Sequence, residues 1–327
     1  MQIVIITDGN NTLGMGHVYQ SLTLAETLLH VKDINANIIF ITKSEKPIVD
    51  LIEKRGFKVI YLQNDDLIFD QLQELNPDRI IFDKLDVSPD LAKNIKEKLG
   101  IKLTIFTNLT EANNLADITV MAGMGSDFKN IYEKNSIHNN IQFWGPKYWL
   151  LRPEFYSYKA KPFTGTINKI MLIFGGSDQA NLSSHVLDEL MKMDKKFHIN
   201  IILGAAFSHH KELNEIIEKN AQSKSSVEIT KSLVKVAETM YANDLVFVSP
   251  GLSFFEAISV STPVLCFHQN EFQENAWKGH IKTYDKNETS LIPDLINNSK
   301  FIFHDDEDIS RMEIGKGITE IINEILN

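Results

Sequence analysis

The chain has 327 residues, of which 43% are hydrophobic and 23% are charged, and its formal net charge at pH 7 is −10. Single hydrophobic cores rarely grow beyond about 250–300 residues, so this length predicts two domains with packed cores. The acidic balance repels polyphosphates and anionic lipid surfaces, which argues against a nucleic-acid partner. The single cysteine, Cys266, excludes an internal disulfide and a thiolate metal cluster.

The chain begins with a strand-like apolar run at residues 1–6, which lacks the basic flank and the longer apolar stretch of a signal peptide. No apolar run reaches the length that spans a bilayer. We therefore expect a cytoplasmic protein without stable membrane insertion.

Short β-branched runs alternate with helical patterns through the first half of the chain, which is typical of βαβ units and a parallel sheet. Strands are expected at 2–6, 37–42, 57–61, 79–82 and 102–105. The clearest helix follows the first strand, where Leu22, Leu24, Ala25 and Leu28 recur at helical spacing. The first half is therefore predicted to be a doubly wound domain.

A second alternating series opens at Ile167, after a stretch rich in proline and aromatic residues that we interpret as a linker. Strands are expected at 169–174, 198–203, 226–229, 245–248 and 263–267, with helices at 181–193, 208–221, 232–241 and 252–260. The predicted architecture is α/β, with two Rossmann-like domains at 1–146 and 167–327 that face a central cleft and are joined by a linker at 147–166. Residues 307–326 are expected to form a terminal helix, which packs on one domain or crosses back to the first.

A glycine-rich turn stands between the first strand and the first helix, with TDG at 7–9 followed by GMGH at 14–17. Glycines let a ligand approach the backbone closely, and the free amides of a helix N-terminus favour an anion. On this interpretation His17 lies just inside the helix and faces the cleft. In the alternative, Gly14 and Gly16 only shape a turn and His17 caps the helix, because short glycine patterns are common.

A similar turn, FGGSD at 174–178, stands in the second half. The amides of Gly175 and Gly176 and the hydroxyl of Ser177 can hold a diphosphate, while Asp178 or Asn181 is the candidate cap for the helix that follows. Phosphate contact and a plain turn are both open at this point.

The third turn is SPGLSFFE at 249–256, where a strand passes tightly into a helix. The Gly251 amide and the Ser253 hydroxyl can address a phosphate, and Glu256, one turn into the helix, can accept both hydroxyls of a ribose. In the alternative, Glu256 only complements the positive end of the helix dipole.

Four strings agree in order with one family: TDGNNTLGMGHVYQSLTLA at 7–25, GPKYWLLRPEF at 145–155, GGSDQANL at 175–182 and SPGLSFFEA at 249–257. In these strings the chain resembles the nucleotide-sugar hydrolases of pseudaminic acid biosynthesis, which act on UDP-2,4-diacetamido-2,4,6-trideoxy-altrose. The resemblance extends over nearly the whole chain. It implies the GT-B fold, which the related peptidoglycan N-acetylglucosaminyltransferase shares, and a UDP-sugar substrate.

The resemblance also implies roles for individual residues. His17 becomes the general base that activates water, or an acceptor hydroxyl, for inverting attack at the anomeric carbon, and Asp8 and Asn270 join it as catalytic residues. The predicted substrate- and nucleotide-binding residues are Gly14, Gly16, Gly175, Gly176, Ser177, Gly251, Leu252, Ser253 and Glu256. No cofactor and no metal is expected, because amides and hydroxyls can neutralise the departing UDP. The positive end of the helix is expected to lower the pKa of His17.

Three positions depart from the hydrolase pattern. Gln20 and Glu271 stand where the family has Arg and Gln, and the family's Asp-x-Tyr element near the active site appears as Asp83-Lys84-Leu85, without the Tyr. Hydrolysis is the first hypothesis. The alternative is a GT-B glycosyltransferase that passes the sugar to a glycan or lipid-linked acceptor. A non-catalytic binding module is disfavoured, because His17 is retained.

Overall fold

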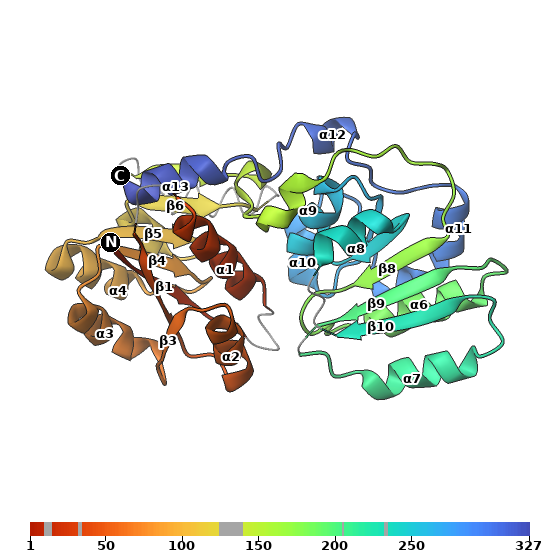
Figure 1. Cartoon of the computed structure of the whole chain (residues 1–327), viewed down its shortest axis with the longest axis horizontal. Coiled ribbons are helices and arrows are strands. Elements are labelled where there is room, and N and C mark those ends of the chain that lie inside the picture. The colour runs from red at the N-terminus through yellow and green to blue at the C-terminus, as the bar shows by residue number, and fades with distance from the viewer. Residues whose placement is uncertain (10–14, 32–34, 124–139, 205, 232–234) are drawn as a thin grey trace. The chain divides into compact units, whose positions relative to one another are not determined.

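The structure is a computed structural model that describes residues 1–9, 15–31, 35–123, 140–204, 206–231 and 235–327. These residues form two compact units, the first made of Met1–Leu150 with Glu313–Asn327 and the second of Leu151–Met312. Each unit is a parallel β-sheet covered by helices (Figure 1). None of the helices in the described residues is both long and apolar enough to cross a bilayer.

The sheet of the first unit consists of β3 (Lys58–Tyr61), β2 (Asn37–Thr42), β1 (Gln2–Thr7), β4 (Arg79–Asp83), β5 (Lys102–Phe106), β6 (Ile118–Met121) and β7 (Ile141–Trp144), in that spatial order. All neighbouring strands pair in parallel. Because β1 lies between β2 and β4, the strand order reverses between β1 and β4. The carboxyl ends of these two strands therefore flank the switch point of the sheet, where open α/β sheets bind ligands.

Successive residues of β1 alternate between two cores. Ile3 and Ile5 pack with α1 (Gly16–Leu29), α2 (Lys46–Lys54) and α13 (Ile318–Leu326). Val4 and Ile6 pack on the other face with α3 (Ile68–Leu75) and α4 (Pro89–Asn94). The shorter helices of this unit are η1 (Asp65–Leu67), η2 (Ile95–Leu99), η3 (Glu111–Leu115) and η4 (Pro146–Tyr148). The period of two in a sheet covered on both faces explains why the strands read as continuous apolar runs.

The C-terminal segment differs from the single helix predicted at 307–326. α12 (Glu307–Ser310) belongs to the second unit and α13 to the first. Between them the backbone has positive φ at Glu313 (47°) and Gly315 (74°), which a continuous right-handed helix does not allow. The prediction of one unbroken helix is therefore wrong.

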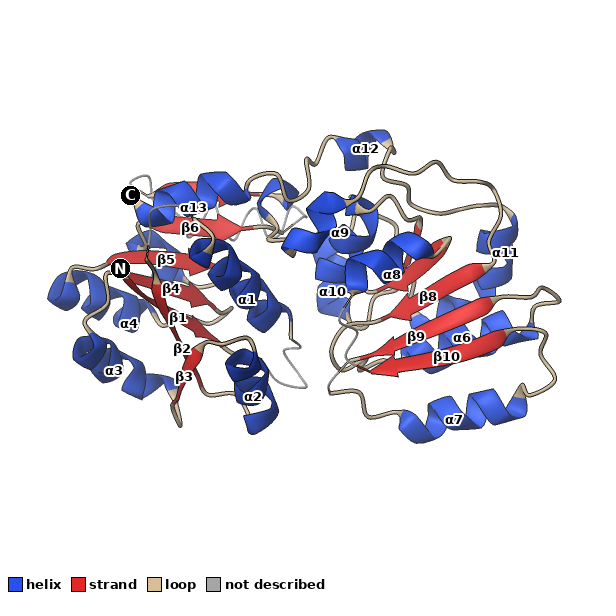
Figure 2. Ribbon diagram, viewed as in Figure 1, coloured by secondary structure: helices blue, strands red, loops and turns tan. Residues whose placement is uncertain are grey.

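The sheet of the second unit consists of β10 (Ser226–Lys231), β9 (His198–Leu203), β8 (Lys169–Ile173), β11 (Leu245–Val248) and β12 (Val264–Cys266), in that spatial order. Figure 2 shows this parallel sheet with its helices. They are α6 (Leu182–Lys192), α7 (His210–Lys219), α8 (Val236–Ala242), α9 (Leu252–Ser259), α10 (Glu271–Trp277) and α11 (Ile292–Asn297), with the short η5 (Pro153–Ser157) and η6 (Lys286–Leu291). The switch point of this sheet lies between β8 and β11.

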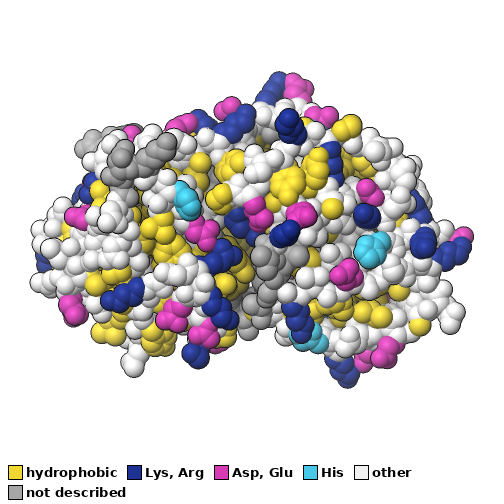
Figure 3. Space-filling view, viewed as in Figure 1, with side chains coloured by type: hydrophobic (Ala, Val, Ile, Leu, Met, Phe, Trp, Pro, Cys, Tyr) yellow, Lys and Arg dark blue, Asp and Glu magenta, His cyan; other side chains and the backbone are white. Residues whose placement is uncertain are grey.

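The ten strands predicted from the sequence are all present, and their ends agree with the prediction to within two residues. β6 and the edge strand β7 were not predicted. On the face shown in Figure 3, apart from the grey residues, Lys and Arg side chains are interspersed with Asp and Glu, and no broad area of one sign stands out.

Candidate functional site

The switch point of the first unit brings together residues that are far apart in the sequence. Thr7, the last residue of β1, lies opposite Asp83, the last residue of β4. Asp8 and Lys84 continue these two strands beyond the sheet. α1 begins after β1 at Gly16, and its first turn carries His17. The described part of the predicted turn is therefore at the carboxyl edge of the sheet, and Gly14 lies outside the described residues.

His17 forms a short, directed contact with the end of β4. Its Nδ1 lies 2.7 Å from Oδ1 of Asp83. The other carboxylate oxygen, Oδ2, accepts hydrogen bonds from Gln20 Nε2 at 3.1 Å and from Ser21 Oγ at 3.2 Å. Asp83 is 2% exposed, so this carboxylate is held inside the protein by three side chains of α1. The carboxylate favours the tautomer with hydrogen on Nδ1, which leaves the lone pair of the imidazole on Nε2.

The pKa of His17 does not follow the sequence prediction. Burial lowers this pKa, but the charge of Asp83 and its hydrogen bond outweigh burial, with smaller contributions from Asp8 and Asp86. The net result is a pKa above the ordinary value of 6.5. The predicted decrease considered the helix end alone, and it is wrong because a buried carboxylate stands in direct contact with the ring.

Asp8, predicted to be catalytic, lies in a network of buried charges. Its Oδ1 accepts hydrogen bonds from Thr42 Oγ1 at 3.0 Å and from the Lys43 amide at 2.9 Å, while its Oδ2 lies 2.9 Å from Lys84 Nζ. Burial lowers the pKa of Lys84, but the carboxylates of Asp8 and Asp65 raise it above the usual range. Asp8 therefore joins the ends of β1, β2 and β4 and adds negative charge near His17.

Gly16 is exposed, and a Cβ built on it meets no atom within 4 Å among the described residues. The first turn of α1 has no side-chain cap. Within the described residues, the N-terminus of this helix therefore has backbone amides without a capping side chain at an open position.

Both glycine-rich turns of the second unit lie at its switch point. Ile173 of β8 pairs with Val248 of β11, so the turns that follow these strands start side by side. Gly175 and Gly251 have φ of 78° and 147°, which favour glycine over residues with a side chain. Gln269 bridges the two turns, because its Nε2 donates to the carbonyl oxygen of Phe174 at 2.9 Å and to Ser249 Oγ at 3.0 Å.

The helices that follow these turns are capped differently. Asp178 accepts hydrogen bonds from the amides of Leu182 at 2.8 Å and Ser183 at 2.9 Å, so it caps α6. α9 has Gly251 at its N-cap position and no side-chain cap, which leaves the first amides, those of Leu252 and Ser253, without a capping side chain. Among the described residues, the uncapped donors that an anion at this switch point could use are therefore at α9 rather than at α6.

Gly204, which follows β9, determines how closely the chain approaches the first of these turns. A Cβ at this position would overlap the carbonyl oxygens of Gly175 and Gly176. We expect Gly204→Ala to displace the turn and to destabilise the second unit by about 1–3 kcal/mol, as overpacking typically does. Calorimetric melting curves measure the effect, and Gly16→Ala is the control because its Cβ has free space. Equal melting temperatures for both variants would contradict the prediction.

Glu256 lies one turn into α9 and is 2% exposed. Arg152, just before η5, contacts it twice: Nε donates to Glu256 Oε1 at 2.8 Å, and Nη2 lies 2.8 Å from the same oxygen. Within the described residues, Oε2 of Glu256 accepts no hydrogen bond. Residues 253 and 256 are three positions apart, so Ser253 and Glu256 share one face of the helix.

Asn270, predicted to be catalytic, is exposed and caps α10. Its Oδ1 accepts a hydrogen bond from the amide of Gln273 at 2.9 Å. Asn270 belongs to the second unit and His17 to the first. A role of Asn270 toward a ligand stays a prediction.

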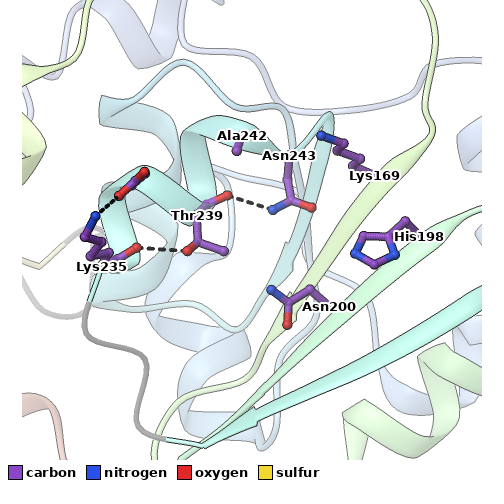
Figure 4. Close-up of a pocket in the computed structure, with 8 residues that line it drawn as sticks. Lys169, His198, Asn200, Lys235, Thr239, Ala242 and Asn243 are labelled. Carbon is purple, nitrogen blue, oxygen red and sulfur yellow. Dashed lines mark hydrogen bonds and ion pairs between the residues drawn. The ribbon is translucent and has the colours of Figure 1, made fainter.

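A pocket of about 590 Å³ lies elsewhere in the second unit (Figure 4). It is lined by Lys169, His198 and Asn200 of the sheet and by residues of α8 and its flanks, among them Lys235 and Thr239. Lys169 and His198 are the first residues of β8 and β9, so this pocket is at the amino ends of these strands. It is therefore separate from the glycine-rich turns, which follow the carboxyl ends.

The family resemblance places Asp83 near the active site but gives it no role, and it does not assign Arg152 to the site. Both are charged residues that the structure buries against a predicted site residue. Asp83 carried one signal, because it directly follows the strand predicted at 79–82. Arg152 carried another, because it lies within the string GPKYWLLRPEF.

No protein-family model matches the chain. The chain is 40% identical over 333 residues to the uncharacterized protein MJ1062 of Methanocaldococcus jannaschii, with 100% of this chain and 66% of that protein covered. It therefore spans just under two thirds of the length of this relative. It is 27% identical over 281 residues to the spore coat polysaccharide biosynthesis protein SpsG of Bacillus subtilis, with 84% of this chain and 79% of that protein covered.

Three solved structures are similar over essentially the whole chain. MurG of Acinetobacter baumannii has a TM-score of 0.64 at 11% identity, with 100% of this chain and 99% of that chain covered. The UDP-GlcNAc 2-epimerase of Neisseria meningitidis, bound to UDP-GlcNAc, has 0.61 at 12%, with 100% and 99% covered. HepE of Anabaena, in complex with UDP-glucose, has 0.59 at 14%, with 100% and 96% covered. These likenesses confirm the predicted GT-B fold.

Proposed function

We propose that the chain is a nucleotide-sugar enzyme that breaks the bond between an anomeric carbon and UDP by inverting attack of an oxygen nucleophile. The observation that carries this proposal is the contact of His17 with Asp83 at the switch point of a GT-B unit. Support comes from the nucleotide sugars bound to HepE and the epimerase and from the role of SpsG in polysaccharide biosynthesis. Because the chain spans 66% of MJ1062, the proposal concerns the chemistry of this part.

In the proposed step, Asp83 accepts the Nδ1–H of His17 and Nε2 takes a proton from the attacking water. The oxygen forms a bond to the anomeric carbon as the bond to the β-phosphate oxygen breaks, and the electron pair of that bond leaves with UDP. A positioned base of this kind contributes about 10²–10⁴-fold to rate. The product sugar has the inverted configuration, because the nucleophile approaches opposite the leaving group.

We further propose that the first unit holds the sugar side and the second the nucleotide, which is the division predicted for 1–146 and 167–327. The diphosphate would lie on the amides of Gly175, Gly176, Leu252 and Ser253 and on the hydroxyls of Ser177 and Ser253. Glu256 would accept hydrogen bonds from the ribose. The pitch of a helix, about 5.4 Å per turn, fits a phosphate at the start of α9 and a ribose one turn further.

Hydrolysis of a UDP-diacetamido-trideoxyhexose is the first form of this proposal, because the four family strings match along the chain. Transfer of the sugar to a glycan or lipid-linked acceptor is the second. Gln20, Leu85 and Glu271, which depart from the hydrolase pattern, favour transfer, and the likeness to SpsG, a polysaccharide biosynthesis protein, is compatible with it.

Release of UDP without an acceptor tests this proposal. We expect the protein to release UDP from UDP-2,4-diacetamido-2,4,6-trideoxy-altrose in the presence of EDTA, with the inverted anomer as the first sugar signal in the NMR spectrum. A panel of other UDP- and CMP-sugars serves as the comparison. UDP release only after a glycan acceptor is added would support transfer, and tight binding of UDP-sugars without turnover under either condition would contradict both forms.

A further inference from the structure

We propose that Arg152 is a positioning residue that turns one carboxylate oxygen of Glu256 toward the ribose of the bound nucleotide. The inference rests on the proposed function, because it assumes that the second unit binds UDP. It assigns a role to a residue of the segment that enters the second unit, at the boundary between Leu150 and Leu151.

The geometry of the pair is one-sided. Arg152 directs Nε and Nη2 to the same oxygen, Oε1 of Glu256, each at 2.8 Å. An arginine fork often grips both oxygens of a carboxylate, one with each nitrogen. Here one oxygen receives both donors, and within the described residues the other has no hydrogen-bond donor. The hydroxyls of a ribose can supply this missing donor.

Arg152 is itself held in place. Its guanidinium carbon lies 5.1 Å from the ring centroid of Phe155, a residue that is 1% exposed. Its Nη1 lies 3.5 Å from Oε1 of Glu154. The side chain of Arg152 is 18% exposed and that of Glu256 is 3% exposed, so this pair is largely shielded from water. The stacking ring and the second carboxylate restrict the guanidinium, which in turn restricts Glu256.

The positive charge of Arg152 also affects the protonation of Glu256. Burial raises the pKa of Glu256 above its ordinary value, and Arg152 opposes this increase. Without the guanidinium, burial acts with little opposition and Glu256 takes up a proton at higher pH. A protonated carboxyl is a weaker acceptor for the ribose hydroxyls. Arg152 thus orients Glu256 and favours its ionised form.

The experiment compares the affinities of UDP, 2′-deoxy-UDP and 3′-deoxy-UDP by titration calorimetry between pH 6 and 9. The ratio of the affinity for UDP to that for a deoxy form reports the ribose contact and does not depend on the fraction of protein that is folded. The variants are Arg152→Met, Arg152→Lys and Glu256→Gln. Arg311→Met is the matched control, because Arg311 forms an exposed pair with Glu307 in the same unit.

The wild type is expected to prefer UDP over at least one deoxy form by about tenfold or more, the value of one charge-assisted hydrogen bond. Glu256→Gln should reduce this preference to about two- or threefold. Arg152→Met should reduce it similarly near neutral pH and recover it only in part as the pH rises, because Glu256 then ionises but is no longer oriented by the guanidinium. Arg152→Lys, which retains the charge, should lie between these values, and Arg311→Met should match the wild type.

Each result decides a different question. If Arg152→Met retains the ribose preference and its pH profile while losing only thermal stability, Arg152 is merely structural and the inference is wrong. If the wild type binds UDP without a preference for ribose, Glu256 does not touch the ribose and the inference also fails, although the nucleotide site stands. If the wild type binds no UDP at all, the proposed function itself fails.

Discussion

Replacement of His17 by asparagine is expected to reduce kcat by about two orders of magnitude or more, while the Kd for UDP changes by no more than a few-fold. A positioned base contributes about 10²–10⁴-fold, and asparagine cannot take up the proton of the nucleophile. The affinity for UDP should persist because the proposed nucleotide contacts are made by residues of the second unit. A loss in kcat without a loss in UDP binding is what removal of a group that acts in the transition state produces.

A second histidine on the same helix supplies the control. His30, at the end of α1, is exposed and bonds through Nδ1 to the carbonyl oxygen of Glu26 at 2.6 Å. His30→Asn should leave kcat within about twofold of the wild type, since the side chain lies in solvent. If His17→Asn turns over as fast as His30→Asn, His17 is a part of the helix start only and the proposed mechanism is wrong.

The fold was accessible from the sequence because its strands are buried on both faces. Runs such as Gln2–Thr7 and Leu245–Val248 are almost wholly apolar and β-branched, and they stand apart from the helical patterns between them. Two elements were predicted poorly, and each has a local reason. β7 has two exposed residues among four, so its pattern resembles a loop. The prediction of one terminal helix was wrong at Glu313 and Gly315, where positive φ interrupts the helix although the apolar pattern continues.

The site was only partly accessible, because its key contacts join residues that are distant in the sequence. His17 could be selected from its glycine-rich turn, but its partner Asp83 is 66 positions away and is brought close by the pairing of β1 with β4. Arg152 and Glu256 are 104 positions apart. The sequence assigned a role to one member of each pair, and the fold brings that member into contact with the other. The predicted decrease in the pKa of His17 was wrong for the same reason, because it considered the helix end without the buried carboxylate of Asp83.

The contact between Asp83 and His17 leads to an expected effect of comparable size. Asp83→Asn should lower the pH-independent kcat/KM by about 10²–10⁴-fold, because an amide no longer holds the tautomer with hydrogen on Nδ1 or stabilises the imidazolium. Burial continues to lower the pKa of His17 in this variant, while the carboxylate that raised it is gone. The variant should therefore combine a slower reaction with a base that stays neutral to lower pH.

The pH profile provides the measurement and its sign. His17 acts as a base only when neutral, so kcat/KM of the wild type should fall as the pH drops through a pKa above 6.5. In Asp83→Asn this acidic limb should move to lower pH.

The same pair affects folding. Its stabilising contribution is present below the pKa of His17 in the unfolded chain and is lost as the pH rises through the pKa of His17 in the folded protein, so the thermal stabilities of the wild type and Asp83→Asn should converge toward alkaline pH. Asp90→Asn, an exposed aspartate on α4, is the matched control. An acidic limb at the same pH in the wild type and in Asp83→Asn would show that Asp83 does not set the protonation of the base, and the assignment of His17 and Asp83 as a catalytic pair would be wrong.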